Sequence, residues 1–129
     1  MKPKVLFLFL WPFFWGCSIS EPKEDKLVRK NISDGNISVK WYYYSHITNK
    51  SPDFVVVKKE DREQEIFQAE GVITDVSIVG QSVIIKEFKP ERGIIYTKEV
   101  PSDVFGYKIK LDSSSTLEEY RDTPDGVRE

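Results

Sequence analysis

The sequence is poor in the residue types on which most catalytic and metal sites depend. Its 129 residues include a single cysteine, Cys17, and a single histidine, His46. One cysteine excludes an internal disulfide, a Cys₂ or Cys₄ zinc site and a haem-attachment motif. A Ser-His-Asp or Cys-His catalytic arrangement would have to include His46, and the chain has no nucleophile-elbow motif. We therefore expect no metal and no cofactor, and we interpret His46 as a polar residue on the outer face of a strand.

The sequence also lacks an excess of positive charge and a long hydrophobic run. It has 19 Lys and Arg against 21 Asp and Glu, for a net charge of −2. Nucleic-acid-binding proteins carry clustered basic residues, so we expect no nucleic-acid partner. The longest apolar run, residues 5–15, has no charge but is shorter than the roughly 20 residues of a membrane-spanning helix.

This short apolar run is typical of a secretion signal. Lys2 and Lys4 precede it, and Gly16 and Cys17 end it, after which the chain becomes polar. Residues 1–17 resemble a bacterial lipoprotein signal peptide, although Phe14 and Trp15 depart from the residues usual before the cysteine. The alternatives are an ordinary cleaved signal and an uncleaved membrane anchor.

The resemblance has direct consequences for Cys17. It implies that the sulfur receives a diacylglyceryl group, that cleavage occurs before Cys17, and that the new amino group is acylated, for example with palmitate. Two or more acyl chains hold a protein stably on a membrane. The expected location is the bacterial cell envelope, with a lipid anchor in the outer membrane. The membrane is then the first partner of the protein.

Composition divides the chain into four parts. Residues 1–16 are the predicted signal peptide, and the polar residues 17–35 are a predicted flexible tether from the lipid, in which Leu27 and Val28 leave room for a short ordered piece. Residues 36–121 form the predicted β domain, and residues 122–129 contain a turn signal and are expected to fray. Because Cys17 is committed to lipid, this domain has to be stable through its hydrophobic core alone.

Several short segments with β patterning make up the predicted domain. From residue 37, Ile37, Val39, Trp41, Tyr43 and Ile47 alternate with more polar residues, which predicts a strand with this set facing the core. Further strands are expected at 54–57, 65–70, 72–79, 82–88, 94–100 and 105–111, with a charged connection at 58–65. Gly80-Gln81 suits a type II′ hairpin turn, and Ser115 with Glu118 resembles a capping box for a short helix. The sequence predicts an all-β fold: a small antiparallel β-sandwich or barrel of six to seven short strands, with room for a short C-terminal helix.

The aromatic run at residues 41–44 is the most unusual feature of the predicted domain. Alternation places Tyr42 and Tyr44 on the face opposite Trp41, together with Lys40 and His46. Aromatic rings beside polar groups suit stacking on sugars or on an apolar patch of another protein. Lys40, Tyr42, Tyr44 and His46 are therefore our candidate binding surface. The alternative is that a loop or the C-terminal tail covers the two tyrosines.

These observations favour a non-catalytic binding or assembly module with a protein or glycan partner in the envelope. A small envelope hydrolase with a carboxylate pair in a β cleft is the alternative, because a chain with 21 acids always offers pairs. An inhibitor that inserts the loop Lys89–Gly93 into an enzyme cleft is a third, weaker hypothesis. The sequence leaves the oligomeric state open.

Overall fold

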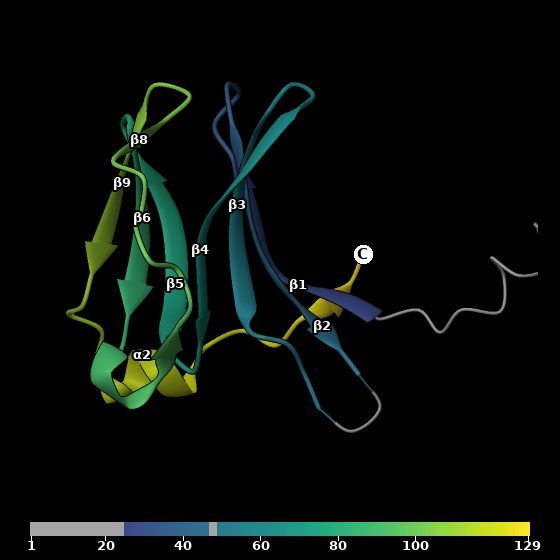
Figure 1. Ribbon diagram of the computed structural model, residues 1–129, viewed down its shortest axis with the longest axis vertical. Helices are drawn as coiled ribbons and strands as arrows, with labels where there is room; N and C mark the ends of the chain where they lie inside the picture. Colours follow the sequence, from purple (N-terminus) through teal and green to yellow (C-terminus); the bar gives the residue numbers. More distant parts are fainter. Residues whose placement is uncertain (1–24, 47–48) are drawn as a thin grey trace, which may run out of the picture.

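The computed structural model describes residues 25–46 and 49–129, which form a sandwich of two β-sheets (Figure 1). The large sheet has the strand order β10-β1-β2-β3-β4-β7, and the small sheet has the order β5-β6-β9-β8. The strands are β1 (Asp25–Ser33), β2 (Ser38–Ser45), β3 (Asp53–Lys59), β4 (Arg62–Glu70), β5 (Ile73–Val79), β6 (Ser82–Glu87), β7 (Ile94–Ile95), β8 (Asp103–Val104), β9 (Tyr107–Asp112) and β10 (Val127–Arg128). The all-β prediction is confirmed, and of the two expected architectures the sandwich is correct, but the described residues form ten strands rather than six to seven. The predicted signal peptide, 1–16, and Cys17 lie outside the described residues.

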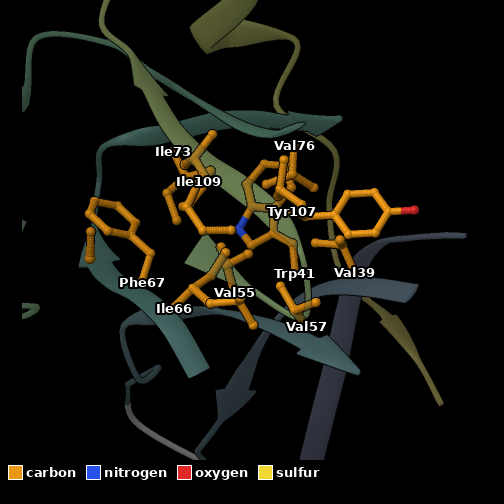
Figure 2. Close-up of a cluster of buried hydrophobic side chains, with 14 of the residues drawn as sticks. Val39, Trp41, Val55, Val57, Ile66, Phe67, Ile73, Val76, Tyr107 and Ile109 are labelled. Atoms are coloured by element: carbon orange, nitrogen blue, oxygen red, sulfur yellow. The ribbon is translucent and has the colours of Figure 1, made fainter. Parts of the chain in front are cut away.

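The core lies between the two sheets, and Trp41 is at its centre (Figure 2). Val55 from the large sheet and Val76 from the small sheet belong to the same cluster, and all three side chains are fully buried. Full burial of an aliphatic side chain of this size contributes roughly 1.5–3 kcal/mol. This core is what holds the two sheets face to face.

The period-two pattern in β2 predicted the core correctly up to Trp41. Ile37, Val39 and Trp41 are buried, as expected. Tyr43, which the pattern also assigned to the core, is only half-buried, whereas Tyr42 on the opposite face is 9 % exposed. At Tyr42 the outer face is therefore also shielded, by the neighbouring side chains of Phe54 and Lys26. Ile47 lies outside the described residues.

The small sheet contains the hairpin that the sequence predicted and one strand pair that it did not. β5 and β6 pair antiparallel around Gly80, whose φ of +58° is the positive value that the first central residue of a type II′ turn requires. β6 and β9, however, pair in parallel. The small sheet is therefore mixed, which corrects the prediction of a purely antiparallel fold. The connection that makes a parallel pair feasible is residues 88–106, which include the 3₁₀ helix η1 (Pro90–Arg92), β7 and β8.

Three expected strand boundaries were wrong. The charged stretch 58–65 is mostly strand, because β3 and β4 continue through it to a tight turn at Glu60, whose φ is 58°. The expected strand 94–100 is reduced to β7, which pairs only with the end of β4. Phe105 has a φ of 52° and lies in the turn before β9. In β9 itself, Tyr107 and Ile109 are buried as predicted, but Leu111 is 43 % exposed.

The N-terminal boundary of the domain was also wrong. Residues 25–33, predicted to be part of the flexible tether 17–35, form β1, which pairs with β2 along its length. This strand is polar because its outer face is turned to solvent and all three of its basic residues form ion pairs. Lys26 pairs with Glu129, Arg29 with Asp53, and Lys30 with Asp75 across the sandwich. The described domain therefore begins by residue 25 rather than 36.

The C-terminal segment is also ordered. Residues 122–129, which were expected to fray, include β10, which pairs with Leu27 and Val28 of β1. The short helix is confirmed as α2 (Leu117–Arg121). Its capping box is formed by Thr116 and Glu119, one residue later than the expected Ser115 and Glu118. The domain therefore reaches at least to residue 128, well beyond the predicted limit of 121.

Candidate binding surface

Three aromatic rings pack together on the outer face of the large sheet. We call Tyr42, Tyr44 and Phe54 the aromatic cluster. The Tyr42 and Phe54 rings are stacked with centroids 5.5 Å apart, and Tyr44 meets them edge-on at 5.6 and 5.9 Å. β2 places the two tyrosines two residues apart on one face, and the β2–β3 register sets Phe54 directly opposite Tyr42.

The three rings differ in how much of their surface is accessible to a ligand. Tyr42 is nearly covered, since Phe54 lies against its ring and the Lys26 Nζ lies 4.3 Å from its centroid. Burial, with smaller contributions from Tyr44 and nearby glutamates, raises the pKa of Tyr42 to about 12. Tyr42 is therefore neutral at physiological pH and supports the cluster from within. Tyr44 and Phe54, which are half-buried, form its accessible part.

A groove lined with lysines lies beside the aromatic cluster. Lys26, Lys40 and Lys58 line it together with Asn31, Ser33, Ser38, Val56 and Glu63, and its volume is about 450 Å³. The Glu129 carboxylate lies between two of these lysines: it forms an ion pair with Lys40 and lies 3.5 Å from the Lys26 Nζ. The Glu129 carboxylate shows that this site accommodates an anionic group.

The structure brings together three of the four residues predicted for the binding surface. Lys40, Tyr42 and Tyr44 share the outer face of β2 and are contiguous with the groove. His46 is exposed but follows the last residue of β2, where its backbone N–H donates a hydrogen bond to the Asn49 carbonyl. It therefore lies in the β2–β3 loop, which corrects the prediction that it lies on the outer face of a strand.

Sequence reasoning missed Phe54, Lys26 and Glu129. Phe54 was assigned to a strand but not to this surface, because only the pairing register places it opposite Tyr42. Lys26 and Glu129 were expected in a tether and a frayed tail. The apolar residues Leu27, Val28 and Ile32 were the only signal for β1, and they do not alternate regularly with polar residues.

A second polar site lies inside the sandwich, at the opposite side of β1. The Asp53 Oδ2 accepts a hydrogen bond of 2.8 Å from the Trp41 Nε1 and lies 2.9 Å from the Arg29 Nε. The Arg29 and Asp53 side chains are only 9 % and 12 % exposed. Arg29 also lies over the Tyr43 ring, with Cζ 4.3 Å from its centroid, and donates a 2.7 Å hydrogen bond to the Pro124 carbonyl.

This buried ion pair borders a mixed-charge cavity of about 370 Å³. Two further carboxylates, those of Glu70 and Asp125, also line it. Burial raises the pKa of Asp53, while the neighbouring Arg29 and the Trp41 hydrogen bond oppose that rise. Because the Asp53 Oδ2 already has two partners, its geometry suits holding β1 against β3 more than acting on a substrate.

The remaining candidate residues do not assemble into a metal or catalytic centre. In the part of the chain that the structure describes, no three or more His, Cys, Asp and Glu side chains are arranged to hold a metal ion. Glu87 is 2 % exposed and accepts a hydrogen bond from Ser113, but its Oε1 has no hydrogen-bond partner. Gly93, in the loop Lys89–Gly93, packs closely against the Val72 side chain and the Glu70 carbonyl, so this loop is held against the sandwich at one end.

The comparisons with known proteins give no relative for this domain. No family model, no curated protein and no solved structure matches the chain. Among the residues that the structure describes, there is no helix with the length and apolar character of a membrane span.

Proposed function

We propose that this protein is a lipid-anchored, non-catalytic binding module of the bacterial envelope, which presents the outer face of its large sheet to a partner. The observation that carries the proposal is the position of the aromatic cluster beside the lysine groove. Stacking surface and positive charge occur side by side on a face that no other layer of the described fold covers. Such a combination suits a partner with apolar or ring-shaped groups next to an anionic group.

The lipid anchor is the second part of this proposal. It is supported by the resemblance of residues 1–17 to a lipoprotein signal. With β1 starting at Asp25, only residues 18–24 separate that strand from Cys17. Such a linker spans at most roughly 27 Å when extended, so the domain would act close to the membrane surface. The intact mass of the membrane-extracted wild type should exceed the mass calculated for unmodified residues 17–129 by the lipid increment, and Cys17→Ser should lack this increment. A wild-type mass without the increment contradicts the anchor.

Capture of partners from detergent-solubilised envelope tests the binding surface. We expect Tyr44→Ala and Phe54→Ala to reduce capture at least tenfold, because they remove the accessible part of the aromatic cluster. Tyr120→Ala is the matched control, since Tyr120 is 38 % exposed and lies on α2, away from the outer face of the large sheet. Circular dichroism verifies that each variant is folded. Unchanged capture by folded Tyr44→Ala and Phe54→Ala contradicts the proposed surface.

The alternative of a carboxylate-pair hydrolase has weaker support. Its best location is the cavity that Asp53, Glu70 and Asp125 line. A glycosidase needs one carboxyl group free to donate a proton and a second free to act as base or nucleophile. Asp53 is instead engaged by Arg29 and Trp41, and this arrangement favours a structural role for it.

A further inference from the structure

The C-terminal residues 122–129 cross from α2 to the open edge of the large sheet, and we call them the strap. In Figure 1 the yellow C-terminal segment reaches the side of the molecule where β1 begins. The Pro124 carbonyl accepts the hydrogen bond from Arg29, and β10 then pairs with β1. Gly126 passes so close to β1 that an added Cβ would lie 2.5 Å from the Leu27 Cβ and 2.7 Å from the Tyr43 ring.

The strap covers little of the edge that it occupies. β1 has nine residues, and β10 pairs with two of them, Leu27 and Val28. An edge strand offers its unpaired backbone N–H and C=O groups to any extended segment that reaches it. Neither residue of β10 is buried, and Val127 is 70 % exposed. Hydrophobic burial therefore contributes little to holding β10 in place.

Charge complementarity supplies much of the attachment. Arg128 lies 2.8 Å from Asp25, and Glu129 forms ion pairs with Lys26 and Lys40. Exposed ion pairs of this kind are individually weak and are screened by salt. The strap is thus an extended segment that ends in an acidic residue, and it is held by the Arg29–Pro124 hydrogen bond, a short ladder and surface charges.

We propose that the edge of β1, together with Lys26 and Lys40, is a docking site for an extended, acidic peptide segment of a partner protein, and that the strap occupies this site until the partner displaces it. The partner segment would pair antiparallel with β1 and place a carboxylate where Glu129 now lies. Strand addition to an open edge is a common mode of peptide recognition, in which main-chain hydrogen bonds give affinity and side chains give specificity. The inference rests on the proposed function and names its partner class.

The backbone ladder favours a peptide over a glycan. The strap demonstrates that this edge forms antiparallel main-chain hydrogen bonds in the register Leu27 to Arg128 and Val28 to Val127. A glycan has carboxylates or hydroxyls but no repeating backbone amide to continue the ladder. A partner peptide could also pair with more of β1 than β10 does, because within the described residues the part of β1 after Val28 has no strand partner on that side.

The test uses a fluorescein-labelled peptide with the sequence of residues 122–129 and the detergent-solubilised full chain, measured by fluorescence anisotropy. In the wild type the strap competes from the same chain at an effective concentration of about millimolar. Gly126→Val should release the strap, since the new side chain meets Leu27 and Tyr43. We expect this variant to bind the peptide at least tenfold more tightly than the wild type. A peptide with Gln at its last position should bind about two- to fivefold more weakly than the Glu peptide, as expected for the loss of exposed ion pairs.

A second variant guards against a folding defect in Gly126→Val. Glu129→Gln weakens the strap without a steric change, so it should also bind the Glu peptide more tightly than the wild type does. Glu91→Gln, at an exposed glutamate of η1, is the matched control and should leave peptide binding unchanged. Equal affinity of the wild type, folded Gly126→Val and Glu129→Gln overturns the inference, as does equal binding of the Glu and Gln peptides.

Two further readouts separate the competing explanations. The first is analytical ultracentrifugation of Gly126→Val. If this variant forms a dimer that does not bind the peptide, the occupant of the site is a second copy of this chain, and the assignment of a partner peptide is overturned. Partner capture that depends on Tyr44 and Phe54 but not on the strap variants would overturn this inference and leave the proposed function intact. Partner capture that depends on the strap variants but not on Tyr44 and Phe54 would overturn the proposed aromatic surface alone.

Discussion

Two clusters of opposite charges lie on the two sides of β1, and they differ in almost every physical respect. Arg29 and Asp53 form a buried pair that also uses the Trp41 indole. Lys26, Lys40 and Glu129 form a cluster on the outer face, with Glu129 48 % exposed. The β-bulge between Val28 and Lys30 separates the two clusters, since the extra residue there, Arg29, is turned toward the interior.

Similar ion pairs therefore have different roles on the two sides of one strand. The buried pair costs desolvation, which raises the pKa of Asp53, and removal of one partner leaves the other charge uncompensated. The outer cluster is exposed, so its desolvation cost is small. Its lysines lower the pKa of Glu129, chiefly through the hydrogen bond with Lys40. The first therefore fixes β1 in the sandwich, and the second is suited to exchange.

The largest expected effect comes from breaking the buried pair. Asp53→Ala leaves Arg29 buried without its counter-ion and the Trp41 N–H without an acceptor. Loss of one partner of a buried pair costs about 3–5 kcal/mol of the free energy of unfolding. Urea denaturation measures this change. A cost below about 1 kcal/mol would mean that the cluster is not the buried structural pair described above.

A double substitution should have a smaller effect than the single one. Asp53→Leu together with Arg29→Met removes both charges and keeps apolar volume at each site, and such replacements are often neutral. The Trp41 N–H would still lose its acceptor, which costs roughly 1–3 kcal/mol. We expect the double variant to be more stable than Asp53→Ala in the same denaturation experiment. If the loss of stability in the double variant equals the sum of the losses in Asp53→Leu and Arg29→Met measured separately, Arg29 and Asp53 do not act as a pair.

The smallest effect, and the sharpest contrast, concerns pH. The folded state raises the pKa of Asp53 above 3.8, so the stability of the wild type relative to Asp53→Asn should increase as pH falls through that raised pKa toward 3.8. The folded state lowers the pKa of Glu129 below 4.5, so any advantage of the wild type over Glu129→Gln should disappear as pH falls from 4.5 through that lowered pKa. Urea denaturation from about pH 7 to about pH 3 distinguishes the two trends. Differences of the same sign for both residues would contradict the contrast.

The sequence predicted best where local pattern and burial agree. The alternation from Ile37 to Trp41 and the Gly80 hairpin are local features, and both are present in the structure. β1 was missed because an edge strand with a polar outer side has little hydrophobic periodicity, and its Arg29 and Lys30 are accommodated by distant acids.

The candidate site was predicted only in part for a related reason. Tyr42 and Tyr44 were identified from one strand, but the cluster also needs Phe54, and the groove needs Lys26. The register between neighbouring strands and the path of residues 122–129 decide these contacts. Both depend on pairings between residues far apart in the chain, which no local pattern specifies.

The parallel pairing of β6 with β9 has a consequence for how the domain folds and unfolds. The connection between these strands leaves the small sheet, pairs through β7 with β4 of the large sheet, and then returns. Closing a long loop costs chain entropy before its contacts are gained, so this pairing belongs among the slow, late steps of folding. Because one connection joins both sheets, neither sheet can come apart alone without disturbing the other. Unfolding should therefore be a single cooperative event, in which partner-dependent changes are confined to the periphery of β1.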